Sequence, residues 1–328
     1  MGISLLESSF TEEGLQFDRK WMIVDLEKNK HLSPRDNRGI KLARVKPSFD
    51  FERGMLDVSF PDDPSVPSFS MPLDPPAEEV FGWEEVEGVN LWGNNLSGRV
   101  VPSSTPGAPD PSVVLSNLTG HHVKLVMKPP AHLRPVPFAT IDAAGLDYEG
   151  GPRTVFADVG PFMIASTASV VDAQRRIGEA QKAGAIEWDI NREVSIDRWR
   201  PNLVVEGVET PFGEDDWIEG QVGDKQYSLL FPGRVPRCIF PNVDPATGVR
   251  DSQVPHKVLM GYRRVVPQPG LYYFGYVLST LLRSDPATYR YMVSYRVYGV
   301  PVSAAGVLRV GDRIKITKHA PNPLRQGS

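Results

Sequence analysis

The chain has 328 residues, of which 41% are hydrophobic and 23% charged, an ordinary composition for one large or two average globular domains. A formal net charge of −4 argues against nucleic acid as a partner, because nucleic-acid binders usually carry a basic excess. A single cysteine excludes an internal disulfide framework and a zinc site made of several cysteines. No apolar stretch is long enough to span a bilayer and no signal peptide is visible, so we expect an intracellular, soluble protein.

The first third of the chain predicts short strands at regular spacing. Glycine (29) and proline (31) interrupt the chain often, which favours a β-rich or mixed fold with few long helices. A region rich in proline and aspartate, residues 61–79, is expected to be irregular. The predicted strands are a strand–turn–strand over 20–34, single strands over 39–52 and 54–62, and a strand pair over 85–101. This spacing is typical of a small barrel or sandwich.

The middle of the chain predicts two helices. The first covers residues 111–119 and ends at Gly120, and a strand over 121–128 follows it. The second covers residues 165–183, with Ser166 or Thr167 as its N-cap, an apolar stripe at 3- and 4-residue spacing, and Gly184 as its stop. Further strands are predicted over 201–207 and 225–231, and a strand–turn–strand over 306–319.

We therefore predict an α+β, β-rich fold with two domains. An N-terminal β-barrel-like domain is expected over residues 1–128 and a second β-rich domain with few helices over residues 129–320. The boundary is placed here because the chain becomes irregular after Pro129 and stays so to about residue 160. No internal repeat is visible.

Common catalytic and nucleotide-binding motifs are absent. The chain has no Gly-x-Gly-x-x-Gly, no Walker A loop and no Gly-x-Ser-x-Gly. None of the six histidines stands at a spacing typical of zinc ligands, which argues against a zinc hydrolase.

The lone cysteine, Cys238, lies in an unusual setting. An isolated cysteine is most often a small buried apolar residue. Here Arg234 and Arg237 lie within four residues, and the turn-rich stretch "PNVDPATG" follows, so an exposed thiol with thiolate character is also consistent with the sequence. A thiolate is a good ligand for a soft metal.

A second polar group comes earlier, in "DRWRPNLVVEG". Arg200 and Asn202 stand two apart on an incipient strand, so we expect both side chains on one face. A guanidinium and an amide suit a phosphate or an oxygen-rich ring, although a solvated strand end has the same pattern.

These stretches carry a resemblance to a known family. "RWRPNLVVEG", "VPRCIFPNVDPATG", "GYRR" and "GVLRVGDRIKI", in this order, resemble the MOSC domain. "GLQFDRKWMIVD" and "LSPRDNRGIKLARV" resemble the N-terminal β-barrel domain that precedes it in molybdenum-cofactor reductases typified by the mitochondrial amidoxime-reducing component. The resemblance covers most of the chain and implies a MOSC β-barrel domain behind the N-terminal barrel.

The resemblance also implies site residues. The family's Arg-Cys cysteine is the protein ligand of molybdenum, which makes Cys238 the implied metal ligand and catalytic residue. The implied cofactor is the molybdenum cofactor, a molybdopterin with its metal. Its implied binding residues are Arg19, Asp158, Val159, Gly160, Arg200, Asn202 and Arg237.

The implied function is the reduction of small N-oxygenated compounds of the N-hydroxylated or amidoxime type. The electrons would come from a separate donor protein, because nothing in the chain is typical of a nicotinamide or flavin site. In eukaryotic relatives this donor is a b-type haem cytochrome with its flavin reductase. The alternatives are a non-catalytic MOSC module that carries sulfur or molybdenum cofactor, as in cofactor sulfurases, and a truncated inactive relative.

The chain departs from the family in three places. Relatives open the barrel with a strand whose Lys and Ser hold the cofactor phosphate; it is expected to be missing before Gly2, together with any anchor for the mitochondrial outer membrane. Residues 276–299 have no counterpart, and we hypothesise that they are a non-native insertion. Pro236 stands where some relatives have a serine near the cofactor.

Overall fold

The computed structural model describes residues 2–91, 93–129, 134–135, 153–154, 156–158, 160–189, 191–236, 238–265, 292–303 and 305–320. The chain divides into two compact units. Unit 1 comprises Met1–Ser4, Phe17–Leu133 and Val243–Asp251, and unit 2 comprises Leu5–Gln16, Arg134–Asn242 and Ser252–Ser328. The predicted domain boundary after residue 128 stays a prediction. The two units differ from a simple cut there because residues 5–16 belong to unit 2 and residues 243–251 to unit 1.

Unit 1 is built on a closed barrel. Its strand order is β10-β3-β4-β8-β9, and a separate three-stranded sheet has the order β5-β6-β7. The barrel strands are β3 (Trp21–Asp25), β4 (Lys30–His31), β8 (Glu85–Leu91), β9 (Asn94–Val100) and β10 (Val123–Met127). The other strands are β5 (Lys46–Asp50), β6 (Met55–Ser59) and β7 (Phe69–Pro72). The predicted strand–turn–strand over 20–34 and strand pair over 85–101 are confirmed.

Two local predictions in unit 1 are wrong. Residues 37–44 form a 3₁₀ helix, η1 (Asn37–Arg44), rather than part of a strand. Leu42 and Val45 stand three residues apart, which fits the threefold period of a 3₁₀ helix better than the twofold period of a strand. The region 61–79 is not irregular throughout, because it contains β7 and the start of α1 (Ala77–Phe81).

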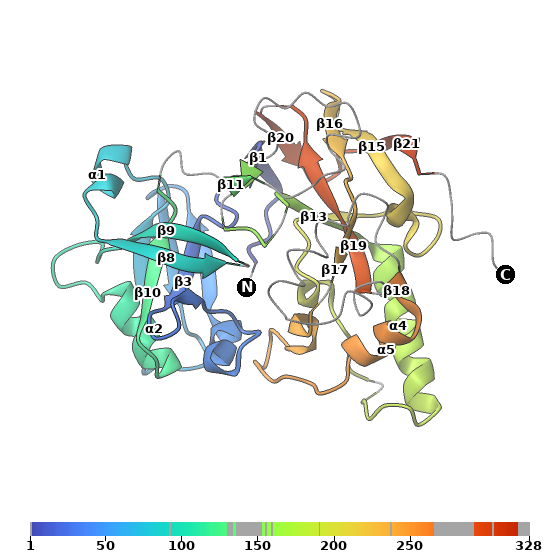
Figure 1. The fold of residues 1–328 in the computed structure, drawn as a ribbon, viewed down its shortest axis with the longest axis horizontal. Coiled ribbons are helices and arrows are strands. Elements are labelled where there is room, and N and C mark those ends of the chain that lie inside the picture. The colour runs from blue at the N-terminus through green and yellow to red at the C-terminus, as the bar shows by residue number, and fades with distance from the viewer. Residues whose placement is uncertain are drawn as a thin grey trace. The chain divides into compact units, whose positions relative to one another are not determined.

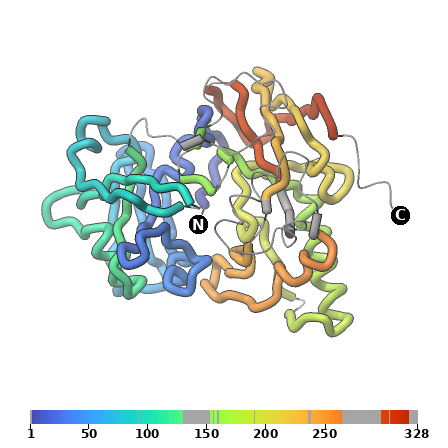
Figure 2. The backbone as a smooth tube through the Cα atoms, in the orientation of Figure 1, coloured from blue at the N-terminus to red at the C-terminus, as the bar shows by residue number. Residues whose placement is uncertain are grey.

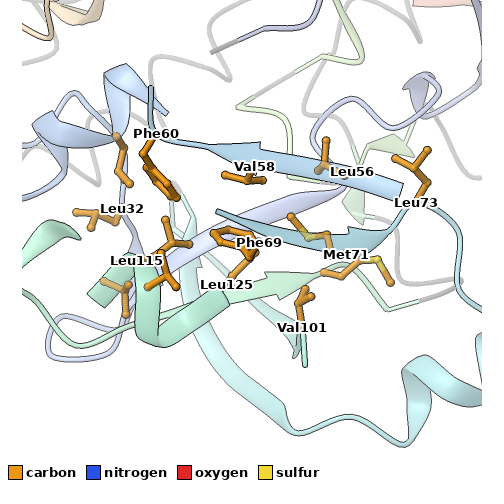
Figure 3. Packing of buried hydrophobic residues seen from close by; sticks show 14 of the residues in the cluster. Leu32, Leu56, Val58, Phe60, Phe69, Met71, Leu73, Val101, Leu115 and Leu125 are labelled. Atoms are coloured by element: carbon orange, nitrogen blue, oxygen red, sulfur yellow. The ribbon is translucent and has the colours of Figure 1, made fainter. Parts of the chain in front are cut away.

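The core of unit 1 is one apolar cluster between its sheets and helix α2 (Pro111–Thr119). Figure 3 shows Phe60, Phe69 and Leu115 meeting within it. The helix begins where the Asp110 carboxylate accepts hydrogen bonds from the backbone N–H groups of residues 112 and 113, and it ends at Gly120 with φ +74°. The predicted stop at Gly120 is therefore confirmed, and the Asp110 cap, which was not predicted, fixes the other end of the helix.

Unit 2 contains an eight-stranded sheet. Its main path is β14-β13-β19-β16-β15-β21, and β17 and β18 also pair with β19 (Figure 1). The strands are β13 (Phe162–Ser166), β14 (Leu203–Val205), β15 (Trp217–Val222), β16 (Tyr227–Leu230), β17 (Arg234–Pro236), β18 (Arg264–Val265), β19 (Met292–Pro301) and β21 (Ile314–His319). A short pair, β11 (Arg134–Pro135) with β12 (Arg153–Thr154), also belongs to this unit.

The start of the chain joins the end of the chain in unit 2. Strand β1 (Glu7–Thr11) pairs with β2 (Gly14–Leu15) and with β20 (Ala305–Arg309), and Figure 2 shows the dark-blue start of the tube beside the red strands. The buried ring of Phe10 packs edge-on against Phe162 and Tyr227, with centroids 6.0 and 5.2 Å away. This contact ties the first strand to the apolar core of the large sheet.

The helices of unit 2 pack at one end of its sheet. They are α4 (Thr167–Lys182) and α5 (His256–Tyr262), with 3₁₀ turns η2 (Ile196–Arg198), η3 (Gly213–Asp216) and η4 (Phe240–Asn242). The Ser166 hydroxyl accepts from the backbone N–H of Ser169, and Gly184 follows the last turn with φ +68°, so the predicted cap and stop are confirmed. The β-rich fold class with few helices is confirmed as well. No helix in the described part of the chain is long and apolar enough to cross a membrane.

The final part of the extra segment is integral to this sheet. Residues 292–299 lie in β19, which pairs with β13, β16, β17 and β18. Removing these residues would leave β13, β17 and β18 without this partner strand. That residues 276–299 are a non-native insertion stays a hypothesis. Residues 276–291 lie outside the described residues.

Candidate functional site

Asn202 joins the start of β14 to β13. Its backbone N–H donates to the Met163 carbonyl at 2.7 Å, and its side-chain Oδ1 accepts from the Met163 N–H at 2.9 Å. The parallel ladder continues directly after it, from Ile164 opposite Leu203. The two bonds fix the plane of the Asn202 amide, so its Nδ2 group, which can only donate, has a defined direction.

Arg200 has an unusual backbone conformation. Its φ is +55°, and its N–H closes a turn onto the Asp197 carbonyl at 3.1 Å. A non-glycine residue in the left-handed region, directly before a proline, is disfavoured by about 1–2 kcal/mol and is found most often at functional sites. Because Arg200 precedes β14 and is left-handed, the expected strand alternation with Asn202 is wrong. Arg200 ends a turn that begins at Asp197, and Asn202 begins the pairing with β13.

The Arg200 side chain lies against the segment that carries the cysteine. Its guanidinium carbon is 4.7 Å from the centroid of the Phe240 ring, a cation–π distance. The backbone N–H of Phe240 points at Cys238 Sγ, with N and S 3.5 Å apart. Cys238 is a free, exposed thiol, so its sulfur is accessible for a ligand bond. The structure therefore brings Arg200 and Cys238 together through one intervening residue.

A buried ion cluster holds the strand that leads to Cys238. The Asp215 carboxylate, in η3, lies 3.1 Å from Arg234 Nε in β17 and 2.7 Å from Arg263 Nη2 at the end of α5. All three side chains are buried. Arg263 also stacks over Phe212 at 3.9 Å. The Arg234 charge, expected to act on the thiol, is thus paired with a carboxylate and fastens β17 to η3 and α5.

A second buried carboxylate holds the start of α4. Glu214 is fully buried, and its two oxygens contact the hydroxyls of Ser166 at 2.9 Å and Ser169 at 2.8 Å, while the Ser166 N–H donates to Oε1 at 3.2 Å. The two hydroxyl oxygens are 2.7 Å apart. Burial raises the pKa of the Glu214 carboxyl, although the hydrogen bonds oppose that shift. These contacts fix the junction of β13 and α4.

The loop before β13 contains the remaining candidates of unit 2. Asp158 is half-buried and Gly160 is buried just before Phe162. The hairpin of β1 and β2 holds this loop closely, since a Cβ on Gly14 (φ +121°) would lie 2.9 Å from the Pro161 carbonyl oxygen. Val159 and Arg237 lie outside the described residues, so their place in the site stays a prediction.

Arg19 belongs to unit 1. Like Arg200 it is left-handed, with φ +54°, and its Nε lies 3.4 Å from the Asp18 carboxylate. Of the three arginines that the resemblance assigns to the cofactor, Arg19 and Arg200 therefore share a strained backbone conformation. That Arg19 acts together with the residues of unit 2 stays a prediction.

The "DPATG" turn behind the cysteine has a structural role in unit 1. The Asp244 side chain accepts from the Ala246 N–H at 2.9 Å, and Gly248 (φ +70°) donates to the Asp244 carbonyl at 2.8 Å. Arg250 then donates to Asn37 Oδ1 at 2.7 Å and to the carbonyls of residues 34 and 35. This turn and Arg250 therefore anchor residues 243–251 in unit 1.

The chemistry of these side chains suits a metal that arrives with its own ligands. No group of three or more His, Cys, Asp or Glu among the described residues could hold a metal ion. Unit 2 offers the accessible thiol of Cys238 and the oriented amide of Asn202. It also offers the guanidinium of Arg200, which contacts the ring of Phe240. A thiol binds a soft metal, and the guanidinium and amide bind phosphate and pterin heteroatoms. The donor set fits a molybdopterin.

Sequence reasoning missed three residues of this region: Phe240, Asp215 and Glu214. Phe240 follows Cys238 by two positions, but its contact with Arg200 joins segments that are distant in sequence. The acidic run "GEDDW" is typical of an exposed turn, yet its first two acids are buried. The one available signal was the pair of arginines in "GYRR". Arg263, the first of them, is buried and pairs with the Asp215 carboxylate, so this motif could have indicated a buried acid.

Comparisons with known proteins agree with this geometry. Residues 151–315 match the family described as "MOSC domain". The chain is 25% identical over 317 residues to mitochondrial amidoxime-reducing component 1 of Mus musculus, covering 95% of this chain and 77% of the relative. It is 24% identical over 321 residues to mitochondrial amidoxime reducing component 2 of Rattus norvegicus, covering 95% and 78%.

A second group of relatives is longer. The chain is 25% identical over 241 residues to molybdenum cofactor sulfurase of Danio rerio, covering 74% of this chain but 26% of the sulfurase. The family match spans the thiol, the buried ion cluster and most of the sheet of unit 2. The chain therefore belongs to the MOSC domain family.

Proposed function

We propose that this protein is a molybdenum-cofactor-dependent reductase of small N-oxygenated compounds. The observation that carries the proposal is an exposed thiol, Cys238, in a MOSC-family unit, next to Phe240, whose ring contacts Arg200. The names of the relatives that cover 95% of the chain support the amidoxime-type substrate class.

The chain's own residues would bind and orient the cofactor. Cys238 would supply the protein sulfur to molybdenum. Arg200 would neutralise the anionic part of the pterin, and Asn202 would donate from its fixed amide. When bound, the cofactor would supply the two-electron redox chemistry that no side chain can provide.

The electrons would come from a partner protein. By analogy with the relatives, this donor would be a haem cytochrome with its flavin reductase, and a mitochondrial location is part of the same proposal. The half-buried loop at Asp158 and the buried Gly160 would add polar contacts to the cofactor.

The test measures metal content and turnover separately. We expect purified protein to contain molybdenum and to reduce a model amidoxime with an artificial electron donor. Cys238→Ala should lose both, while Ile239→Ala, which truncates the exposed neighbouring side chain, should keep both. The proposal would be refuted if wild-type protein, purified from a host that produces the cofactor, contained no molybdenum.

A second function is favoured by the sulfurase relatives. In a non-catalytic carrier, the same thiol would hold sulfur or cofactor without turnover. Molybdenum bound in stoichiometric amount with no reduction of any N-oxygenated substrate, using a donor that reduces the bound cofactor, would select this function.

A further inference from the structure

We propose that Phe240 is a positioning residue that holds the Arg200 guanidinium beside the Cys238 thiol. The part that concerns the cofactor rests on the proposed function, and the part that concerns the side chains does not. Two contacts carry the proposal: the guanidinium lies 4.7 Å from the ring centroid, and the Phe240 N–H is 3.5 Å from Sγ.

The two contacts come from different parts of one residue. The N–H belongs to the backbone, so it depends on the fold of η4 and not on the side chain. The ring alone reaches Arg200, whose left-handed backbone gives it a fixed but disfavoured starting direction. An arginine side chain has several rotatable bonds, and the aromatic face selects one direction among them.

Phe240 itself is firmly held. It begins η4, and the last residue of that turn, Asn242, is buried and accepts from the first N–H of α5 through its Oδ1 at 3.1 Å. On the other side, β17 is fastened by the buried pair of Arg234 with Asp215. The ring therefore lies between two anchored elements; Arg200 is half-buried like Phe240, and Cys238 is exposed.

The consequence is electrostatic. A cation held near the thiol favours an anionic group at Cys238, such as the phosphate-bearing pterin of the proposed cofactor. Replacing the ring by an alkyl side chain keeps the N–H contact but removes the cation–π contact to the guanidinium. The expected loss is that of one partly exposed cation–π contact, about 2- to 30-fold in cofactor affinity.

The experiment uses the only cysteine of the chain as its probe. In cofactor-free protein, the rate of alkylation by iodoacetate is divided by the rate with iodoacetamide at one pH. Both reagents attack the same thiolate, so the ratio cancels the thiolate fraction and reports the local potential. By Coulomb's law, any cation within about 10 Å of a thiol changes such a ratio about twofold or more at low salt.

We expect Phe240→Leu to lower the ratio from the wild-type value toward that of Arg200→Gln, and Phe240→Trp to keep the wild-type value. Combining Phe240→Leu with Arg200→Gln should lower it no further, because the ring acts through the arginine. The matched control is Phe81→Leu, which removes the ring next to Arg99 in unit 1 and should change nothing. Thermal unfolding of each variant checks that it is folded.

The same variants are then loaded, and molybdenum retained after gel filtration is measured. Phe240→Leu should retain less than wild type and Phe240→Trp the same. A wild-type ratio in Phe240→Leu, or a further drop in the double variant, overturns the inference. If the alkylation series behaves as expected but wild type holds no molybdenum, the proposed function fails and the positioning role stands.

Discussion

Replacing the buried Glu214 by glutamine tests whether this carboxyl carries a proton in the folded protein. Three oxygen–oxygen contacts link it with Ser166 and Ser169 in a ring, at 2.9, 2.7 and 2.8 Å. Each contact needs one hydrogen, and the two serines bring only two. The third is available only when Glu214 is protonated, which agrees with the rise of its pKa on burial.

The other contacts complete the hydrogen-bond count. The backbone N–H groups of Ser166, Ser169 and Phe212 donate to Glu214 Oε1, Ser166 Oγ and Ser169 Oγ, respectively. In the neutral ring each serine hydroxyl donates once and accepts from both a hydroxyl and an N–H. In the ionised form the contact between the two serine oxygens has no hydrogen, so deprotonation opens the ring.

The sign of the pH dependence follows from the raised pKa. The carboxyl is protonated in both states below its ordinary range, so its stabilisation is fully present there. As pH rises toward the folded pKa, the unfolded state alone loses the proton, and the free energy of unfolding falls by at most about 1.4 kcal/mol per pH unit. Glutamine cannot titrate, so the variant lacks this slope. Its second amide hydrogen has no counterpart in the acid and adds a constant cost of about 1–3 kcal/mol.

The assay is urea unfolding of wild type and Glu214→Gln from about pH 5 to about pH 8. The difference in free energy of unfolding should shift in favour of the variant as pH rises. Glu179→Gln removes an exposed carboxyl of α4, the helix whose start contacts Glu214, and should show no such shift. A difference for Glu214→Gln that stays constant with pH, or shifts in favour of wild type, would refute the proton count.

Three further predictions concern structure and stability. Asp215→Asn leaves the guanidiniums of Arg234 and Arg263 without this buried carboxylate and should lower the free energy of unfolding by about 3–5 kcal/mol, measured by denaturant titration. Burial tends to raise the pKa of Asp172, but hydrogen bonds from two arginines on α4 outweigh burial and lower this pKa. The stabilisation that the Asp172 carboxylate provides is therefore present above the ordinary pKa range of aspartate. It is lost as pH falls through the folded-state pKa. Asp172→Asn should remove that acid loss, at a cost of about 0.5–1 kcal/mol near neutral pH in thermal unfolding. Gly306→Ala places a Cβ 2.6 Å from two aromatic rings behind β20 and should cost about 1–3 kcal/mol by the same measurement.

Each of these has an outcome that contradicts it. Asp215→Asn with wild-type stability would mean that the buried ion cluster does not stabilise the position of β17. Asp172→Asn that follows the wild-type acid profile would assign the acid loss to other carboxyls. An unchanged midpoint in Gly306→Ala would show that the two rings move aside freely.

Local structure was predictable where a short stretch contains its own signals. Helix α2 has an aspartate cap, a proline in its first turn and a glycine stop. The β3–β4 and β8–β9 pairs follow from alternation interrupted by turn residues. The stretch of η1 was not predictable in the same way, because its apolar residues fit more than one period and packing on the barrel selects among them.

By itself, the sequence determined the family and singled out Cys238 as the candidate metal ligand, because the Arg-Pro-Asn and Arg-Cys motifs occur in the order typical of that family. Only the tertiary structure decided which side chains surround that thiol. Arg200 meets Phe240 across about forty residues of sequence, and Asp215 joins Arg234 with Arg263 across a similar span. Such contacts depend on strand order and on burial of charge. Neither strand order nor charge burial is encoded in the spacing of any one segment. For this reason the sequence did not indicate that Asp215 and Phe240 belong to the candidate site.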